Sequence, residues 1–185
     1  MNSAATSKDE ILAKSRELVR QSGWSAVSIR SVAAACGVSV GCIYNYVDSK
    51  ADLVGATVES VWREIFHRQD EPAAFRSTEA CVTWMYERLA YGHERYPGFF
   101  TLHSLGFMGE EKEGGRRRMD GAWRHILAML RAVLERDARV RPGAFTEAFT
   151  AERFADALFS LMLAAMLRGD FDPAAALEIV RRTLY

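Results

Sequence analysis

Apolar residues recur at spacings of three and four along every long segment of this chain, and no stretch alternates with a period of two. The four prolines fall where helices should begin or end. With 185 residues, the chain is long enough for one or two domains with cores of their own. We therefore expect an all-α fold of about nine helices.

Capping signals place the helix boundaries. Ser7 and Glu10 form a capping-box pattern that opens a first helix, and Gly23 offers a left-handed residue to end it. A second helix is expected from Ser28 to Cys36, and a third begins after Ser39. A second capping box starts the fourth at Ser49, and Asp172 with Pro173 starts the last. The later helices are expected at about 50–69, 77–95, 98–107, 115–138, 146–168 and 173–184.

The segment from Gly37 to Lys50 has the spacing of a helix-turn-helix. This motif needs a small residue where its two helices cross, a turn glycine, and an apolar residue inside the second helix. Ala33, Gly37 and Ile43 occupy those places. The triplet alone is a weak signal, but tyrosines that flank Asn45 and the lysine at position 50 strengthen it, because hydroxyl and ammonium groups bind phosphates.

The N-terminal region resembles the TetR (tetracycline repressor) family over about residues 8–55. The residues that carry the resemblance are Gly23, Trp24, Ser28, Val32, Ala33, Gly37, Val38, Ser39, Gly41, Tyr44, Tyr46 and Lys50. The resemblance implies a three-helix DNA-binding domain at 1–50 and a helical effector-binding and dimerisation domain at 51–185. Beyond residue 55, only the expected number of helices supports it.

The resemblance also assigns contacts to DNA. Ser28 and Arg30 match positions that touch the sugar-phosphate backbone, and three further residues match phosphate contacts, namely Tyr44, Tyr46 and Lys50. Positions that face base edges correspond to Val40, Gly41, Cys42 and Asn45, and Ser39 caps the helix that carries them. The asparagine is suited to pairing with adenine, and Val40 or Cys42 to a thymine methyl group. The alternative for either tyrosine is that it only packs the domain.

The charge pattern of this helix departs from the commoner family pattern. Val40 stands where lysine, arginine or proline is frequent, and Val47 where phenylalanine is usual. The chain has no net charge, whereas residues 1–50 carry six basic and four acidic side chains, or +2. Electrostatic attraction to DNA is thus expected from Arg30, Lys50 and the first helix.

The segment 146–168 is apolar nearly all round, so it must be covered on two sides. A symmetric partner, as in the family, would cover one of them, although a buried core helix explains the same pattern. The residues expected at a homodimer interface are Phe154, Leu158, Leu161, Met162, Ala165, Leu177, Val180 and Leu184.

Aromatic residues gather in the middle of the chain, where the family binds an effector. Such side chains line apolar ligand pockets, and they also fill ordinary cores. The candidates for a pocket are Trp62, Phe66, Trp84, Phe100, His103, Phe107 and Trp123. They suggest a small effector that is largely apolar or aromatic.

Other classes of protein find little support. No nucleophile with its base, carboxylate pair or metal-ligand set converges by spacing, so we expect no enzyme, cofactor or metal. The three cysteines suggest no disulfide, and Cys36 and Cys42 are expected to be small apolar fillers, with oxidant sensing as the alternative. No apolar run approaches the roughly 20 residues that span a bilayer, so a cytoplasmic protein without membrane contact is expected.

Two functions remain. The first is a homodimeric transcriptional regulator, in the role of a repressor, that binds a palindromic double-stranded DNA operator and is released by a small-molecule effector. The second is a constitutive DNA-binding or adaptor protein whose C-terminal domain only dimerises or docks a protein partner.

Overall fold

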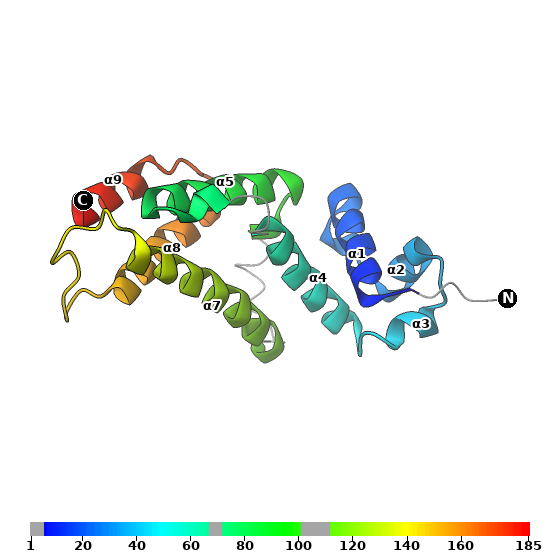
Figure 1. Ribbon diagram of the computed structural model, residues 1–185. Helices are drawn as coiled ribbons and strands as arrows, with labels where there is room; N and C mark the ends of the chain where they lie inside the picture. The colour runs from blue at the N-terminus through cyan, green and yellow to red at the C-terminus, as the bar shows by residue number, and fades with distance from the viewer. Residues whose placement is uncertain (1–5, 67–71, 101–111) are drawn as a thin grey trace. The chain divides into compact units, whose positions relative to one another are not determined.

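The computed structural model describes residues 6–66, 72–100 and 112–185, and within these ranges all regular structure is helical (Figure 1). Its eight α-helices and two short 3₁₀ helices confirm the all-α prediction. They are α1 (Lys8–Ser22), η1 (Trp24–Ala26), α2 (Ile29–Cys36), α3 (Val40–Tyr44), α4 (Lys50–Ile65), η2 (Pro72–Phe75), α5 (Thr78–Arg95), α7 (Lys112–Arg136), α8 (Ala151–Arg168) and α9 (Ala174–Leu184).

The chain divides into two compact units. Unit 1 contains residues 1–64 and 95–97, and unit 2 contains residues 65–94 and 98–185. In unit 1, α1 packs on α2 and α2 packs on α3. Their apolar stripes close a core whose side chains are at most 7% exposed, namely Ile11, Leu12, Val19, Val27, Ile29, Val32, Ala33, Ile43, Val47 and Leu53.

The first capping box forms only in part. The backbone N–H of Glu10 donates to Ser7 Oγ at 3.1 Å, as expected. The Glu10 carboxylate, however, accepts from the Thr6 hydroxyl at 3.0 Å and not from the Ser7 backbone. Thr6 is only 7% exposed, so its hydroxyl competes well for this carboxylate. The hydrogen bond expected from the Ser7 backbone to the Glu10 carboxylate is therefore wrong, and the carboxylate binds the side chain of the preceding residue, Thr6.

A charged cluster around Glu64 joins α1 to the end of α4 inside unit 1. Glu64 Oε2 lies 2.7 Å from Arg16 Nε, and its Oε1 lies 3.2 Å from Arg95 Nε and 3.6 Å from an Arg20 nitrogen. Arg20 also donates to the hydroxyl of the fully buried Tyr96 at 2.9 Å. Burial tends to raise the pKa of Glu64, but hydrogen bonds from Tyr96 and Arg95 and the nearby arginines lower it overall.

Unit 2 is built from α5, α7, α8 and α9, with α7 packed against α8. Its core contains side chains that are at most 4% exposed, such as Cys81, Met85, Leu89, Leu130, Leu134, Phe154, Leu158, Val180 and Leu184. The last residue of α4 also belongs to this unit, where its carbonyl accepts from Arg88 Nε at 2.5 Å. Gly92 of α5 allows close approach there, since a Cβ on it would stand 2.6 Å from Ile65 Cδ1.

Asp137, directly after α7, links three distant segments of unit 2. Its carboxylate accepts from the Thr78 backbone at 2.7 Å, the Tyr185 hydroxyl at 2.6 Å and the Arg139 backbone at 3.1 Å. Arg139 in turn pairs with Glu79 at 2.9 Å. The start of α5, the end of α7 and the end of α9 therefore meet at one buried carboxylate.

The start of α8 differs from the expected position near residue 146. Thr150 caps the helix by accepting from the Arg153 backbone at 3.2 Å, so α8 begins at Ala151. Before it, Thr146 and Phe149 exchange backbone hydrogen bonds of 2.9 and 3.2 Å, which form a tight turn. This turn uses the backbone groups that a longer helix would need. The helix expected at 98–107 falls mostly outside the described residues.

Candidate nucleic-acid interface

The turn between α2 and α3 is set by Gly37, which adopts the left-handed conformation with φ 68° and ψ 27°. Its N–H bonds to the carbonyl of Ala34 at 3.2 Å, and the N–H of Val38 bonds to that of Ala33 at 3.0 Å. Ala33 and Ile43 are 2% and 0% exposed, so they hold the helix pair at the crossing. The three residues of the sequence pattern thus form one helix-turn-helix.

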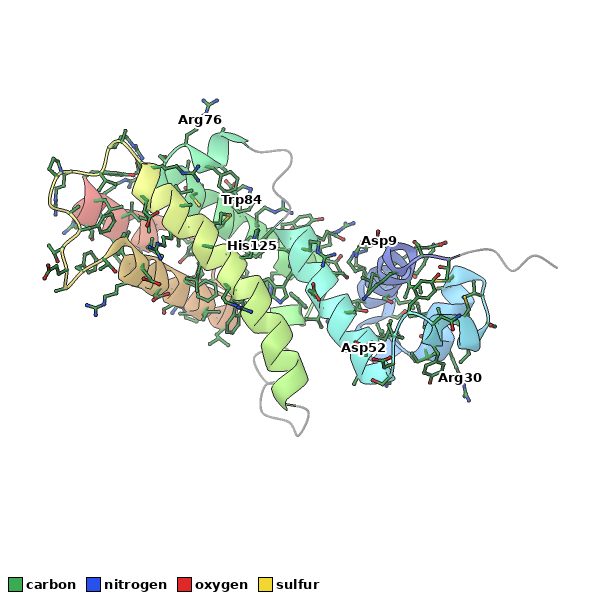
Figure 2. All side chains as sticks on the ribbon, turned by 60° about the horizontal axis from the view of Figure 1, so that its bottom comes forward. Asp9, Arg30, Asp52, Arg76, Trp84 and His125 are labelled. Atoms are coloured by element: carbon green, nitrogen blue, oxygen red, sulfur yellow. The ribbon has the colours of Figure 1, made fainter. Side chains whose placement is uncertain are left out.

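The start of α2 carries a reciprocal cap that sequence reasoning missed. Ser28 Oγ accepts from the Ser31 backbone at 3.1 Å, and Ser31 Oγ accepts from the Ser28 backbone at 2.9 Å. The signal was visible as two serines three residues apart, although serine is less usual than glutamate at the second place. Arg30 is exposed beside this cap, and its side chain projects from the ribbon (Figure 2).

The predicted reading helix is five residues long and is capped by Ser39, which accepts from the Cys42 backbone at 3.3 Å. Its surface is apolar: Val40 is 40% exposed and Tyr44 is 52% exposed. Gly41 and Asn45 are also exposed, the latter just past the helix end, whereas Cys42 is half-buried. The structure therefore leaves accessible the surface expected to meet bases.

The two tyrosines differ in their surroundings. Tyr46 is half-buried beyond the end of α3, and its hydroxyl donates to the backbone carbonyl of Thr6 at 2.5 Å. Tyr44 is the more exposed of the two. The packing alternative considered for both residues thus describes Tyr46 in part, because its hydroxyl joins the N-terminal segment to the turn after α3.

The start of α4 presents Lys50 to solvent at its first helical position. The N–H of Asp52 donates to Ser49 Oγ at 3.1 Å, which is half of the expected capping box. The Asp52 carboxylate accepts from the backbone N–H of Asp48 at 3.0 Å. A complete capping box would use the backbone N–H of Ser49, which is one residue later. The predicted DNA contacts all lie in unit 1, on the starts of α2 and α4, on α3 and in the turn that follows it.

The Cys36 thiol has little thiolate character. Burial raises the pKa of Cys36, and this effect outweighs a hydrogen bond from Thr6. A raised pKa favours the protonated thiol, which is the less reactive form. The raised pKa and partial burial of Cys36 agree with the filler interpretation.

The residues predicted to bind an effector are dispersed among several ring contacts. Trp84 meets Phe66 and Phe75 edge-on, with ring centroids 5.9 and 5.1 Å apart. Trp123 meets Phe159 at 5.7 Å, and Phe100 meets Phe99 at 5.4 Å. Trp62 belongs to unit 1 and is 4% exposed, while His103 and Phe107 lie outside the described residues.

A cavity does occur in unit 2, and none of the described effector candidates lines it. It has a volume of about 200 Å³ and is lined by Phe75, His125, Ala128, Met129, Ala132, Val133 and Arg136. Six of these seven residues follow one face of α7 at helical spacing, a pattern that is visible in the sequence but contains no phenylalanine, tyrosine or tryptophan.

Most residues predicted at the dimer interface serve the core of the chain itself. Six of the eight are at most 3% exposed, namely Phe154, Leu158, Met162, Ala165, Val180 and Leu184. Side chains already covered by their own subunit cannot at the same time face a partner. Leu161 and Leu177 keep partial exposure.

Metal-ligand clusters and membrane-spanning helices are both absent from the ranges that the structure describes. Those residues contain no group of three or more histidine, cysteine or acidic side chains placed to hold a metal ion. Among the same residues, no helix is long and apolar enough to cross a membrane.

The capped starts of α2 and α4, the left-handed turn and the exposed short α3 define a helix-turn-helix DNA-binding domain. Residues 11–57 match the sequence model of a family described as bacterial regulatory proteins, tetR family. The N-terminal domain therefore matches this family of regulators over the region where the resemblance of residues 8–55 predicted it. No curated protein matches the chain.

Solved structures show the same fold along nearly the whole chain. NemR from E. coli, in its reduced form, is 21% identical, with a TM-score of 0.66 and coverage of 96% of this chain and 97% of NemR. A TetR transcription regulator from Haloarcula marismortui is 20% identical with a TM-score of 0.65, and covers 96% and 97%. FadR from Bacillus subtilis, solved with stearoyl-CoA, is 14% identical with a TM-score of 0.63, and covers 97% and 100%.

Proposed function

We propose that the protein is a homodimeric repressor in the cytoplasm that binds a palindromic operator and leaves it when a small effector binds. The observation that carries this proposal is the surface of α3, where Val40, Tyr44 and Asn45 are exposed next to the capped starts of α2 and α4. Exposed large apolar side chains on so short a helix have no partner in their own core, and they suit the thymine methyl groups of a major groove.

The residues around this surface take distinct roles in the proposal. Arg30 and Lys50 supply positive charge to the backbone on either side, while Ser28 and Tyr44 bring hydroxyl groups to phosphates. Tyr46 holds the N-terminal segment beside the turn after α3, because its hydroxyl donates to the Thr6 carbonyl. Asn45 pairs with an adenine, and Val40 and Cys42 meet thymine methyl groups, with Gly41 admitting the close approach of a base edge. Ser39 holds the start of α3 in place by its cap.

We place the dimer contact on the apolar side chains of α8 and α9 that remain exposed. Leu161 and Leu177 are partly exposed, and Leu167 and Ile179 are 67% and 41% exposed. A two-fold pairing through such a surface gives two reading heads and therefore two half-sites, separated by about one helical turn or more, roughly 34 Å.

Release by an effector is supported by the family and by the cavity of unit 2. FadR from Bacillus subtilis is described in complex with stearoyl-CoA, which gives an instance of a small-molecule complex on this fold. In the proposal, effector binding displaces α4, whose first residue is Lys50, so the two reading heads no longer match adjacent grooves. A coupling of about 1–3 kcal/mol produces roughly a 5- to 150-fold loss of operator affinity.

Operator selection from random duplexes with the purified full chain tests this function. We expect an enriched palindrome, a protein that is dimeric in light scattering, and competition by specific duplex only. Enrichment of no sequence, or of single half-sites by a monomer, would contradict the proposal. If operators are found but no compound loosens binding, the constitutive DNA-binding or adaptor alternative replaces the ligand-released repressor.

A further inference from the structure

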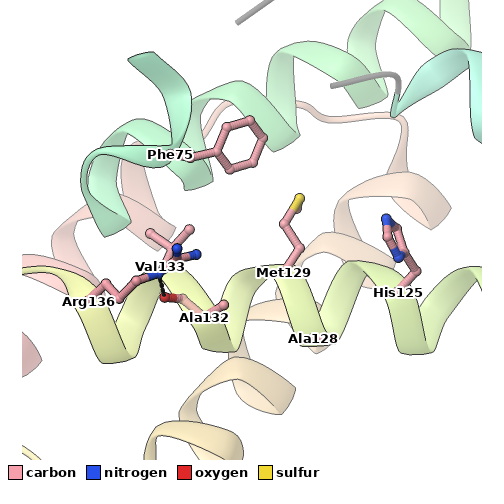
Figure 3. A pocket seen from close by; sticks show the side chains of 7 residues that line it. All are labelled: Phe75, His125, Ala128, Met129, Ala132, Val133 and Arg136. Carbon is pink, nitrogen blue, oxygen red and sulfur yellow. Dashed lines mark hydrogen bonds between the residues drawn. The ribbon is translucent and has the colours of Figure 1, made fainter. Parts of the chain in front are cut away.

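The cavity beside α7 has an apolar floor and polar ends. Met129 and Val133 are 7% and 2% exposed and form its floor, and Phe75 of η2 faces them from the opposite wall (Figure 3). His125 stands at one end and Arg136 at the other. The eleven residue steps from His125 to Arg136 correspond to about 16 Å along the helix at roughly 1.5 Å per residue. The space is thus a trough along α7, with its one permanent charge at Arg136.

Arg136 is oriented by its own helix and pairs with none of the acidic side chains that the structure describes. Its Nε donates to the carbonyl of Ala132 at 2.8 Å, a bond drawn in Figure 3. Among the described residues, no carboxylate lies within ion-pair distance of it. Its sequence neighbours are engaged elsewhere, since Glu135 accepts from Arg131 at 2.8 Å and Asp137 is surrounded by its own donors. The guanidinium therefore adds an uncompensated positive charge to one end of an apolar trough.

A ligand that fills the trough must suit both features. An apolar molecule would gain from contact with Phe75, Met129 and Val133, but it would remove water from the guanidinium without replacing it. A carboxylate at the same end forms charge-assisted hydrogen bonds, and the planar guanidinium suits its two oxygens. The volume of about 200 Å³ lies below the range of roughly 300–1,000 Å³ typical of drug-sized ligands.

We propose that the cavity binds a small amphipathic carboxylate, with its anionic head at Arg136 and its aliphatic or aromatic tail along Met129 and Val133 toward His125. The claim that this cavity is the effector site rests on the proposed function, whereas the claim that it binds a carboxylate does not. The ligand class sharpens the earlier expectation of a largely apolar effector by adding one negative charge.

Calorimetric titration of the full chain with octanoate tests the site, and octanol serves as the uncharged probe. We expect octanoate to bind more tightly than octanol, and Arg136→Gln to weaken octanoate about tenfold or more while leaving octanol unchanged. Arg141→Gln removes an equal charge from an exposed loop position and should leave both unchanged. Ala128→Phe places a large side chain in the trough from an exposed helical position, and should weaken both probes.

The outcomes separate the site from the function. Equal losses of octanoate affinity in R136Q and R141Q, or unaltered binding in Ala128→Phe with native helicity, would overturn the site. Octanoate binding that follows the expected pattern but leaves operator affinity unchanged supports the site and overturns ligand release by it. Operator release by other compounds, with no octanoate binding, overturns this site and leaves the proposed function standing.

Discussion

The hydroxyl of Tyr185 donates a 2.6 Å hydrogen bond to the carboxylate of Asp137, so the end of α9 is fixed to the end of α7. The side chain of Asp137 is 2% exposed, and the same carboxylate receives the backbone N–H of Thr78. A buried, charge-assisted contact of this kind contributes more to stability than an exposed ion pair.

We expect Asp137→Asn to lower the free energy of unfolding by about 2 kcal/mol, because the amide accepts fewer of the donors around it. Tyr185→Phe should cost about 1 kcal/mol, and a double-mutant cycle in urea should show that the two changes are not additive. Glu178→Gln, which alters an exposed pair on α9, serves as the control and should cost less than about 0.5 kcal/mol. Additive costs for Asp137 and Tyr185 would contradict a shared hydrogen bond.

The same contact predicts the pH dependence of stability. Burial tends to raise the pKa of Asp137, but hydrogen bonds from Thr78, Tyr185 and Arg139 outweigh it and hold the pKa far below the ordinary value of 3.8. The unfolded chain therefore binds this proton first, and the stabilisation is complete above about pH 4 and is lost progressively below it. Urea unfolding from pH 6 to pH 2 should show this loss, and Asp137→Asn should flatten it.

The free energy of unfolding should also fall at high pH. Burial and the Asp137 carboxylate raise the pKa of Tyr185 from 10.0 to about 12. A group whose pKa is higher in the folded state stabilises it fully below the unfolded value, so this contribution disappears as the pH rises from 10 toward 12. Tyr185→Phe should remove that part of the alkaline slope, and an unchanged slope would count against the assignment.

The two tyrosines near α3 offer a matched pair of substitutions. Tyr46→Phe removes the bond to the Thr6 carbonyl and should cost about 1 kcal/mol of stability. Tyr44→Phe alters an exposed hydroxyl, so stability should change by less than about 0.5 kcal/mol while operator affinity falls severalfold. Urea unfolding and fluorescence anisotropy on a selected operator measure the two effects, and the reverse pattern would exchange the proposed roles of these residues.

Operator binding should depend clearly, but not extremely, on salt. Arg30, Lys50 and one group on α1 give about three phosphate contacts per subunit, and six in a dimer at roughly 0.9 each predict a log-log slope of about −5. Titrations between low and moderate salt give the slope, and Arg30→Gln should reduce its magnitude by about 2 in the dimer. A slope near zero would argue against duplex binding by this surface.

Gly92→Ala should destabilise unit 2. The new Cβ would lie 2.6 Å from Ile65 Cδ1 and 3.1 Å from Phe100 Cζ, and both side chains are buried. Relief of the crowding should cost about 1–3 kcal/mol, which exceeds the roughly 1 kcal/mol gained from helix propensity. Thermal unfolding of this variant tests the crowding, with Gly41→Ala as the control, because a Cβ on Gly41 meets only Ser39 Oγ at 3.9 Å. Equal changes in stability at the two sites would refute the crowding.

Sequence alone predicted the helices well where apolar periodicity and a capping residue agree. The expected start of the fourth helix at Lys50 and the expected span 77–95 are close to α4 and α5. The start of α8 was misplaced because alanine and phenylalanine continue the apolar pattern through a turn that backbone hydrogen bonds create. The carboxylates of Glu10 and Asp52, which were expected to complete capping boxes, accept hydrogen bonds from other donors. The donor that lies nearest in the folded chain determines the partner, and the sequence pattern does not reveal it.

The helix-turn-helix was predictable because its determinants lie within about twenty residues and act through local geometry. The hydrogen bond between Tyr46 and Thr6 joins residues 40 positions apart, and no local sequence pattern predicts such a tertiary contact. Aromatic residues of unit 2 were the least predictable, because composition does not reveal which rings share a space. Trp84 and Trp123 contact different rings, whereas the cavity uses smaller residues of α7.

The segment between Ser39 and Tyr46 contains no lysine or arginine, and its exposed side chains are neutral. Binding to arbitrary DNA is almost wholly electrostatic, whereas apolar contacts act only where the right base is present. The reading helix therefore adds little to the affinity for arbitrary sites, which comes from the charged groups around it, and the part of the affinity that it does supply depends on the base sequence it meets.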